Sequence, residues 1–476
     1  MTLLLLILIP LLGGIATFFI PNEKSVKSFT LLAAFAMLIV ALYAVYLPAN
    51  SANLTYNHTW LGVMNSNFSL GTDGMSKVLV LLTAVSYPII FIATWKNDYK
   101  EANQFYGLML LTGAGMTGVF LATDCLLFYF FWELALIPAY FLVGKWGGER
   151  RIQASFKFFI YTFVGSLIML IGIIYVYYKT PDQSFAWSSF VKANLTITEQ
   201  RYCFWFFFIA FAIKMPIFPL HTWQPDTYEQ APTAATMVLS GVMVKMGLFA
   251  VVRWLLPVFP QQAAYFSNVI ILFSIIGILY ASLIAMRQND IRQLIAYSSI
   301  AHIGLMCAAL FTDNMSAAQG VGIQLFSHGI NVIGLWIVSN AILQQYGTAK
   351  MNDLGGLAQK APGLAILLVV LALANISLPL TNSFVGEFLM LNGLFQYKPV
   401  YAAVAGISII LAAVYTLRMI QKVFLGESSN FLTVKDVPVS AAVAISLIIV
   451  MIFAFGVYPK PMLQLGEQAM GWLANK

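Results

Sequence analysis

The long apolar stretches of this sequence contain a few ionisable residues of types that can carry protons. Glu133, Lys214, Lys245 and Glu387 each lie well inside such a stretch. A charge at the centre of a bilayer costs roughly 2.5–3.5 kcal/mol on insertion scales, so these residues are expected to pair, to face water or to exchange protons. Burial penalises the charged form of lysine and of glutamate, so each can release or accept a proton. These residue types therefore predict proton transfer through a membrane.

A lysine or arginine near the end of a membrane helix can also extend its side chain to the surface, which is a structural alternative. This alternative suits Lys245 poorly, because Lys245 lies near the middle of the apolar stretch 233–256. For Arg253, Lys157 and Arg418, which lie nearer to the ends of their stretches, we expect either such an extension or structural pairing.

Three of the four histidines fall in the same part of the chain. Histidine titrates near neutral pH and passes protons through either ring nitrogen. We predict that His302 and His328, on consecutive apolar stretches, relay protons, with a plain hydrogen-bonding role as the alternative. We expect His221 to organise a loop. Nearby polar residues could hold bridging waters or simply serve helix packing: Tyr297, Ser298, Ser299, Ser327 and Asn331.

Two apolar stretches are interrupted by proline. The first reads FAIKMPIFPL at 211–220, and the second reads ALANISLPLTNSFVGE at 372–387. Proline removes a backbone hydrogen bond from a membrane helix, and neighbouring groups must replace it. Paired broken helices in two halves of a chain indicate inverted repeats with an ion site between them. Lys214 precedes the first break and Glu387 follows the second. An ionisable residue beside each break favours a role in function over two kinks without a role.

The composition supports a protein embedded in a membrane. Of 476 residues, 60% are hydrophobic and only 9% are charged, whereas soluble domains carry about 25% charged residues. We predict an all-α polytopic membrane protein of about fourteen transmembrane helices, with two inverted repeats of five helices that each contain a broken helix. The predicted spans are 2–20, 29–47, 76–94, 106–122, 125–143, 157–178, 203–220, 233–256, 264–285, 293–311, 317–343, 363–395, 400–424 and 437–458.

These spans divide the chain into four segments. Residues 1–105 hold the first three spans and a loop, 106–256 the first repeat, 264–424 the second repeat, and 437–476 the last span and tail. Placing the N-terminus outside puts fifteen lysines and arginines on the inner side and eight on the outer side. Because cytoplasmic loops are rich in these residues, both termini are predicted on the periplasmic side of a bacterial inner membrane. The same rule explains the net charge of +7, so no nucleic-acid partner is expected.

No motif for a redox centre is found in the sequence. Cys125, Cys203 and Cys307 are far apart and lack metal-ligand spacing. A Gly-rich dinucleotide-binding unit is also missing. We therefore expect no cofactor or metal in this chain.

Four segments resemble the antiporter-like proton-translocating subunits of respiratory complex I. They lie at 124–144, 206–254 (with KMPIFPLHTWQPDTYEQAPTAA), 289–304 (NDIRQLIAYSSIAHIG) and 384–391 (FVGEFLML). Sister subunits of that family usually have lysine where this chain has Glu387, which narrows the resemblance to one subunit type. The resemblance implies a Glu133–Lys214 pair, a central Lys245, His302 and His328 on a polar axis, and Glu387 as the terminal carrier toward the outer side.

The resemblance also implies the partners and the driving force. The partners would be membrane and peripheral subunits of the complex, including sister antiporter-like subunits, together with membrane lipids. FMN, iron–sulfur clusters and quinone would lie in the partner subunits, whose redox chemistry would alter the coupling between Glu133 and Lys214. Three alternatives remain open: a subunit of a multi-subunit sodium/proton antiporter, a subunit of a membrane-bound energy-converting hydrogenase, and a purely structural anchor.

Overall fold

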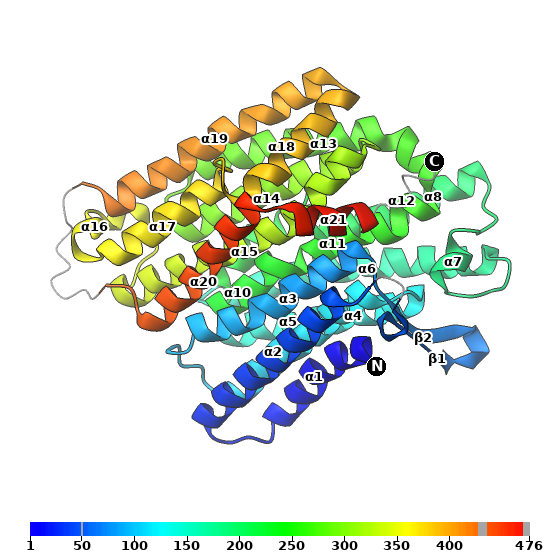
Figure 1. Cartoon of the computed structure of the whole chain (residues 1–476), viewed down its shortest axis with the longest axis horizontal. Helices are drawn as coiled ribbons and strands as arrows, with labels where there is room; N and C mark the ends of the chain where they lie inside the picture. The colour runs from blue at the N-terminus through cyan, green and yellow to red at the C-terminus, as the bar shows by residue number, and fades with distance from the viewer. Residues whose placement is uncertain (49–50, 427–435, 470–476) are drawn as a thin grey trace.

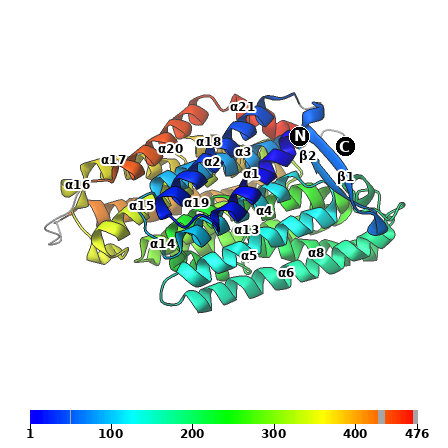
Figure 2. The ribbon, with the colours of Figure 1, turned by 90° about the horizontal axis from the view of Figure 1, so that it is seen from below.

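The computed structural model describes residues 1–48, 51–426 and 436–469, and the chain forms a bundle of long helices that run side by side (Figures 1 and 2). In the described residues the only sheet is a hairpin, in which β1 (Thr55–Leu61) pairs antiparallel with β2 (Ser66–Gly71). The predicted all-α membrane fold is therefore confirmed, with a small hairpin added at one end. Residues 470–476 of the predicted segment 437–476 lie outside the described residues.

The first part of the bundle contains six long helices. They are α1 (Thr2–Thr17), α2 (Glu23–Tyr46), α3 (Gly74–Ala93), α4 (Ala102–Leu121), α5 (Cys125–Trp146) and α6 (Arg151–Lys179). Short 3-10 turns at Ala52–Leu54 and Gly62–Met64 flank β1, and α7 (Trp187–Phe190) lies in the connection after α6.

The middle of the chain contains the first break and a distorted span. Helix α8 (Ile197–Lys214) ends at the break, and the short α9 (Trp223–Gln230) follows it. The span Thr233–Val258 then consists of α10 (Thr233–Val238), the π-helical turn η3 (Leu239–Met243), α11 (Lys245–Ala250), the π-helical turn η4 (Val251–Leu255) and α12 (Leu256–Val258).

The last part contains the second break. Its long helices are α13 (Pro260–Arg287), α14 (Ile291–Leu310) and α15 (Met315–Tyr346), followed by the 3-10 turn Met351–Asp353 and α16 (Leu357–Lys360). The chain continues through α17 (Pro362–Asn375), α18 (Asn382–Tyr397), α19 (Pro399–Phe424), α20 (Val439–Val457) and α21 (Lys460–Ala469). The predicted span 363–395 is thus two helices with a gap between them.

Each of the fourteen predicted stretches falls on helical segments. In the described part of the chain, eleven helices are long and apolar enough to cross a membrane, whereas α1 and α17 are shorter apolar helices. The number of crossings and the inverted repeats remain predictions.

Polar side chains placed just before the helices fix where several of them begin. Asp124 accepts hydrogen bonds from the backbone N–H groups of Leu126 and Leu127 at the start of α5. Thr196 and Glu199 form a reciprocal capping box at the start of α8. Such caps satisfy N–H groups that have no partner within the helix, so both helices that lead to the first candidate residues have defined starts.

The helices differ in how much of their apolar length is buried inside the bundle. The span Thr233–Val258 and helix α15 are buried throughout their apolar windows, whereas α2, α19 and α20 are mostly exposed. A helix that is apolar on all sides and lies in the centre of a bundle has no route to water of its own. Ionisable residues on the central helices are therefore held inside the protein.

Candidate functional site: a line of buried ionisable side chains

Lys214 is the last residue of α8 and is fully buried. Its Nζ atom lies 5.5 Å from the ring centroid of Trp132 and 6.0 Å from that of Phe158. No hydrogen-bond partner for Nζ is present among the described residues. The carbonyl end of α8 carries partial negative charge, and the two ring faces attract a cation. These weak interactions hold the ammonium without a fixed ion pair.

Glu133, on α5, neighbours Lys214 without touching it. The preceding residue, Trp132, lies against Lys214, and Glu133 Oε1 lacks a hydrogen-bond partner in the described structure. The carboxylate and the ammonium do not reach the 4.0 Å distance of an ion pair. The predicted pairing of these two residues therefore stays a prediction, but the structure brings them into electrostatic range.

The first break separates α8 from α9 and contains the cis peptide Phe218–Pro219. His221 is buried there, with ring centroids 5.8 Å from Phe218 and 5.2 Å from Tyr280. These contacts agree with the expectation that His221 organises the loop.

Lys245 begins α11 one residue after the π-helical turn η3. The wider turn is marked by the hydrogen bond from Val244 N to Leu239 O, 3.2 Å long. Lys245 Nζ donates to the backbone oxygen of Ser240 at 2.6 Å, and the side chain is fully buried. The lysine therefore does not extend to the surface. Single π-turns inside helices frequently occur at functional sites, and this one supplies the carbonyl that holds the lysine.

Beyond Lys245 the structure places two histidines and a glutamate in a row. Gly329 of α15, next to His328, packs against Gly241 in the π-helical turn before Lys245. The ring centroid of His328 is 5.4 Å from that of His302 on α14. His302 Nδ1 lies 3.0 Å from Glu387 Oε1 on α18. We call Lys245, His328, His302 and Glu387 the central line. Its members come from four different elements, and protons can pass along such a row by short steps with bridging waters.

The second break, between α17 and α18, has an unusual backbone. Ser377 and Leu380 have φ values of 57° and 75°. Non-glycine residues in this region cost about 1–3 kcal/mol each and persist where the surroundings enforce them, often at functional sites. Asn375 Nδ2, at the end of α17, donates to Ser298 Oγ at 3.3 Å, and Ser298 contacts Tyr415 Oη at 2.9 Å. These side-chain contacts connect the end of α17 to α14 and α19.

Two of the charges assigned to structural roles have fixed partners. Arg253 pairs with Asp73 at 2.7 Å, and Lys157 pairs with Asp226 at 2.7 Å. Their predicted structural pairing is confirmed. Among the described residues, no group of three His, Cys, Asp or Glu side chains is placed to hold a metal ion.

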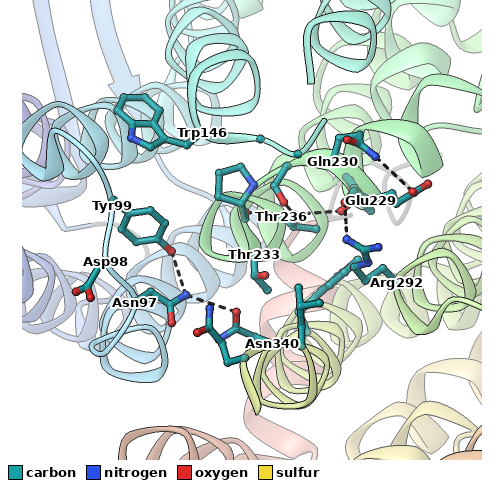
Figure 3. A pocket seen from close by; sticks show the side chains of 18 of the residues that line it. Asn97, Asp98, Tyr99, Trp146, Glu229, Gln230, Thr233, Thr236, Arg292 and Asn340 are labelled. Atoms are coloured by element: carbon teal, nitrogen blue, oxygen red, sulfur yellow. Dashed lines mark hydrogen bonds between the residues drawn. The ribbon is translucent and has the colours of Figure 1, made fainter. Parts of the chain in front are cut away.

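A polar cavity that the sequence did not reveal opens at the end of the distorted span. It has a volume of about 350 Å³, and Tyr228, Thr236, Arg292 and Asn340 are among its lining residues. Figure 3 shows that Glu229 and Arg292 face it from one side, and Asn97 and Asn340 from the other. The lining comes from five separate connections and helix ends. No single motif could therefore have predicted the cavity.

Thr236 links this cavity to Lys245. Ser240 Oγ donates to the backbone oxygen of Thr236 at 2.8 Å, and the backbone oxygen of Ser240 accepts from Lys245 Nζ. Two buried groups at the cavity, Tyr228 Oη and Trp336 Nε1, lack a hydrogen-bond partner in the described residues. Buried polar groups of this kind are usually satisfied by ordered water, so the cavity is suited to hold water one step from the central line.

Comparison with known proteins supports the resemblance noted in the sequence. The family model described as "NADH:quinone oxidoreductase/Mrp antiporter, TM" matches residues 122–412. The chain is 36% identical over 459 residues to NADH-quinone oxidoreductase subunit M of Rickettsia prowazekii. This alignment covers 94% of this chain and 93% of the relative. The chain is also 36% identical over 481 residues to F(420)H(2) dehydrogenase subunit M of Methanosarcina mazei, covering 97% and 95%.

Solved structures also resemble this chain. A chain of respiratory complex I from Thermus thermophilus with bound NADH superposes with a TM-score of 0.92 at 29% identity, covering 99% of this chain and 100% of that one. A chain of the Mrp complex from Dietzia shares the fold, with a TM-score of 0.89 at 19% identity over 99% and 97% of the two chains. The resemblance predicted from the sequence is confirmed, and the chain belongs to the family of membrane subunits of NADH:quinone oxidoreductases and Mrp antiporters.

Proposed function

We propose that the chain is the proton-translocating M subunit of an NADH:quinone oxidoreductase in a bacterial inner membrane. The observation that carries this proposal is the central line, in which four ionisable side chains from four elements meet inside the buried centre of the bundle. The identity to subunit M proteins over most of the chain supports the choice of complex. The other membrane and peripheral subunits supply the redox chemistry, with FMN, iron–sulfur clusters and quinone.

Protons enter this path from the polar cavity and leave beyond Glu387. The cavity is lined by connections that the distribution of basic residues assigns to the inner side, and its wall reaches Thr236, next to Ser240 and Lys245. The hairpin and α7 lie at one end of the bundle and α16 at the opposite end (Figure 1), as expected for an alternating topology with both termini on the periplasmic side. Glu387 is the terminal carrier toward that side.

The Glu133–Lys214 region controls when the path operates. Among the described residues Lys214 has no hydrogen-bond partner, and Glu133 lies outside ion-pair distance from it. A small movement of either helix therefore changes the Coulomb interaction between them by a large fraction of its value. A conformational change in a neighbouring subunit could in this way shift the proton affinity of Lys214 and start transfer along the central line.

The predicted repeats fit the same mechanism. Segments 106–256 and 264–424 each contain one broken helix, with an ionisable residue beside the break. Breaks of this kind place helix ends near an ion site at the interface of two repeats. Lys214 and Glu387 occupy such positions.

One comparison favours a second candidate function. The F(420)H(2) dehydrogenase subunit M of Methanosarcina mazei is as similar as the bacterial relatives and is covered more completely. The same proton path can therefore serve a complex with another electron donor. A proteomic list of the subunits that co-purify with this chain, together with oxidation assays using NADH and reduced F420, separates these candidates.

The test of the proposed function uses the intact complex in sealed vesicles. We expect NADH oxidation by quinone to move protons, and Glu387→Gln to remove most of this transport, because an amide cannot exchange a proton. Assembly is checked by gel filtration and by the oxidation rate in detergent. Full transport in a correctly assembled Glu387→Gln complex would contradict the proposal.

A further inference from the structure

Two buried asparagines connect the helix of His328 to the helix of Glu387. Asn331 Nδ2, on α15, donates to Asn382 Oδ1 at 3.1 Å and to Ser383 Oγ at 2.9 Å. Asn382 Nδ2 donates back to Asn331 Oδ1 at 3.3 Å. Ser327 Oγ adds a bond of 3.2 Å to the backbone oxygen of Asn382. We call these four residues the amide clamp, and all four are buried.

The clamp is located between members of the central line. Asn331 lies three residues after His328, so both lie on the same face of α15. Ser383 lies four residues before Glu387, one turn away on α18. The clamp therefore lies one turn from Glu387, whose Oε1 atom is 3.0 Å from His302 Nδ1.

The start of α18 has no side-chain cap of its own. Thr381 occupies the N-cap position, but its hydroxyl donates to the backbone oxygen of Leu378 and does not cap the helix. The preceding residues Ser377 and Leu380 have left-handed backbone conformations. A helix that begins without a cap after such a segment depends on external contacts for its position, and the amide clamp supplies them.

We propose that Asn331 is a positioning residue that sets the distance between Glu387 and His302 for proton transfer. This inference rests on the proposed function of Glu387. The clamp spans α15 and the first turn of α18, so it fixes the register of the carboxylate in a region where lipid offers no competing hydrogen bonds. Proton transfer depends steeply on the separation of donor and acceptor, so a small displacement has a large effect.

The alternative is that the amides only hold two helices together. A matched control exists, because Asn392 Nδ2 donates to Ser316 Oγ at 3.3 Å between the same two helices, beyond Glu387. Asn392→Ala removes a hydrogen bond between α15 and α18 without touching the turn that leads to Glu387. Asn331→Leu removes the three hydrogen bonds of the Asn331 side chain while keeping the number and branching of its heavy atoms.

The experiment compares the two variants in the assembled complex. We measure protons moved per NADH and the infrared band of the Glu387 carboxyl group, which is identified by its loss in Glu387→Gln. For Asn331→Leu we expect transport to fall roughly tenfold and the carboxyl band to shift, with NADH oxidation in detergent maintained. For Asn392→Ala we expect neither change.

An unshifted band with normal transport in Asn331→Leu would overturn the inference, as would equal effects in Asn392→Ala. If Asn331→Leu fails to assemble, Asn331→Ala replaces it, since that variant removes the same hydrogen bonds without adding a larger apolar group; a band identical to the wild type would then overturn the inference. Normal transport in Glu387→Gln would overturn the proposed function itself, so the two failures are distinguishable.

Discussion

The two broken helices of this protein hold their ionisable residues in opposite ways. At the first break, Lys214 lies against aromatic rings with no hydrogen-bond partner in the described structure, and Glu133 stays beyond ion-pair distance. At the second break, Glu387 contacts His302 at 3.0 Å, and the helix that carries it is held by the amide clamp. The first site is adjustable and the second is pre-positioned.

This difference indicates that the two breaks have different roles in proton transfer. An unpaired lysine close to a carboxylate responds to small movements, because the Coulomb interaction is strong at low dielectric and changes with distance. A carboxylate fixed beside a histidine responds little, but it can exchange a proton quickly once one arrives. The first break is therefore suited to regulate transfer and the second to complete it.

The largest expected effect comes from removing the adjustable charge. Lys214→Met should lower transport by roughly a hundredfold, because a proton carrier is lost from the path. Proton uptake by vesicles during NADH oxidation measures it. Lys157→Met is the matched control, since Lys157 pairs with Asp226 near the end of its helix and should leave transport nearly unchanged. Equal losses in both variants would contradict a special role for Lys214.

At the second break, His302→Gln should lower transport by roughly tenfold, since glutamine keeps a polar side chain but cannot relay a proton. His328 and Glu387 both remain in the central line, which is why the expected loss is smaller than for Lys214. Stopped-flow measurement of proton release after addition of NADH provides the rate. An unchanged rate would mean that His302 does not relay protons.

Glu133→Gln should reduce transport by about threefold, because a carboxylate beyond ion-pair distance acts on Lys214 only through a weakened Coulomb interaction. The variant keeps the shape of the side chain, so assembly should not change. Transport measured over a range of opposing membrane potentials would reveal the loss of regulation. A loss as large as that of Lys214→Met would mean that Glu133 itself carries the proton.

The sequence predicted the types of the important residues better than their arrangement. Lys245 and Glu387 stand out because charges interrupt apolar stretches, and the prolines near 216 and 379 reveal the breaks. The π-helical turn at Leu239–Met243 gives no such signal, because its residues also suit an ordinary α-helix. The contact of His302 with Glu387 joins residues 85 positions apart, and such pairings depend on the packing of whole helices.

Asn331 illustrates the same limit. The sequence shows a buried asparagine near a histidine, which fits a water site or polar packing equally well. Only the fold shows that its partners are Asn382 and Ser383, directly after the second break. The polar cavity is missed for the same reason, since its walls come from five separate segments between residues 97 and 344.

The smallest expected effect concerns the helix before the second break and lies outside the membrane. Asp436 accepts hydrogen bonds from the backbone N–H groups of Val437, Gly363 and Leu364. Burial raises the pKa of Asp436, but these three bonds together outweigh it and hold the pKa below its ordinary value. The Asp436 carboxylate therefore stabilises the start of α17 at pH values above its pKa in the unfolded chain. This stabilisation is lost as the pH falls through its lower pKa in the folded protein.

Asp436→Asn should cost about 0.5–1 kcal/mol of local stability at neutral pH. Hydrogen exchange at the amides of Gly363 and Leu364 measures this cost, and the difference from the wild type should vanish in acid. Transport should not change. A large transport defect would mean that the start of α17 is coupled to the second break.

The central claim is that protons pass through Lys245 between the two breaks, and the most direct test is the number of protons moved per NADH by the Lys245→Met complex in sealed vesicles. Lys245 is fully buried and is held by the backbone oxygen of Ser240, so no surface role competes with this reading. We predict that the proton-to-NADH ratio of the assembled variant falls while NADH oxidation in detergent continues. A ratio equal to that of the wild type would contradict the account.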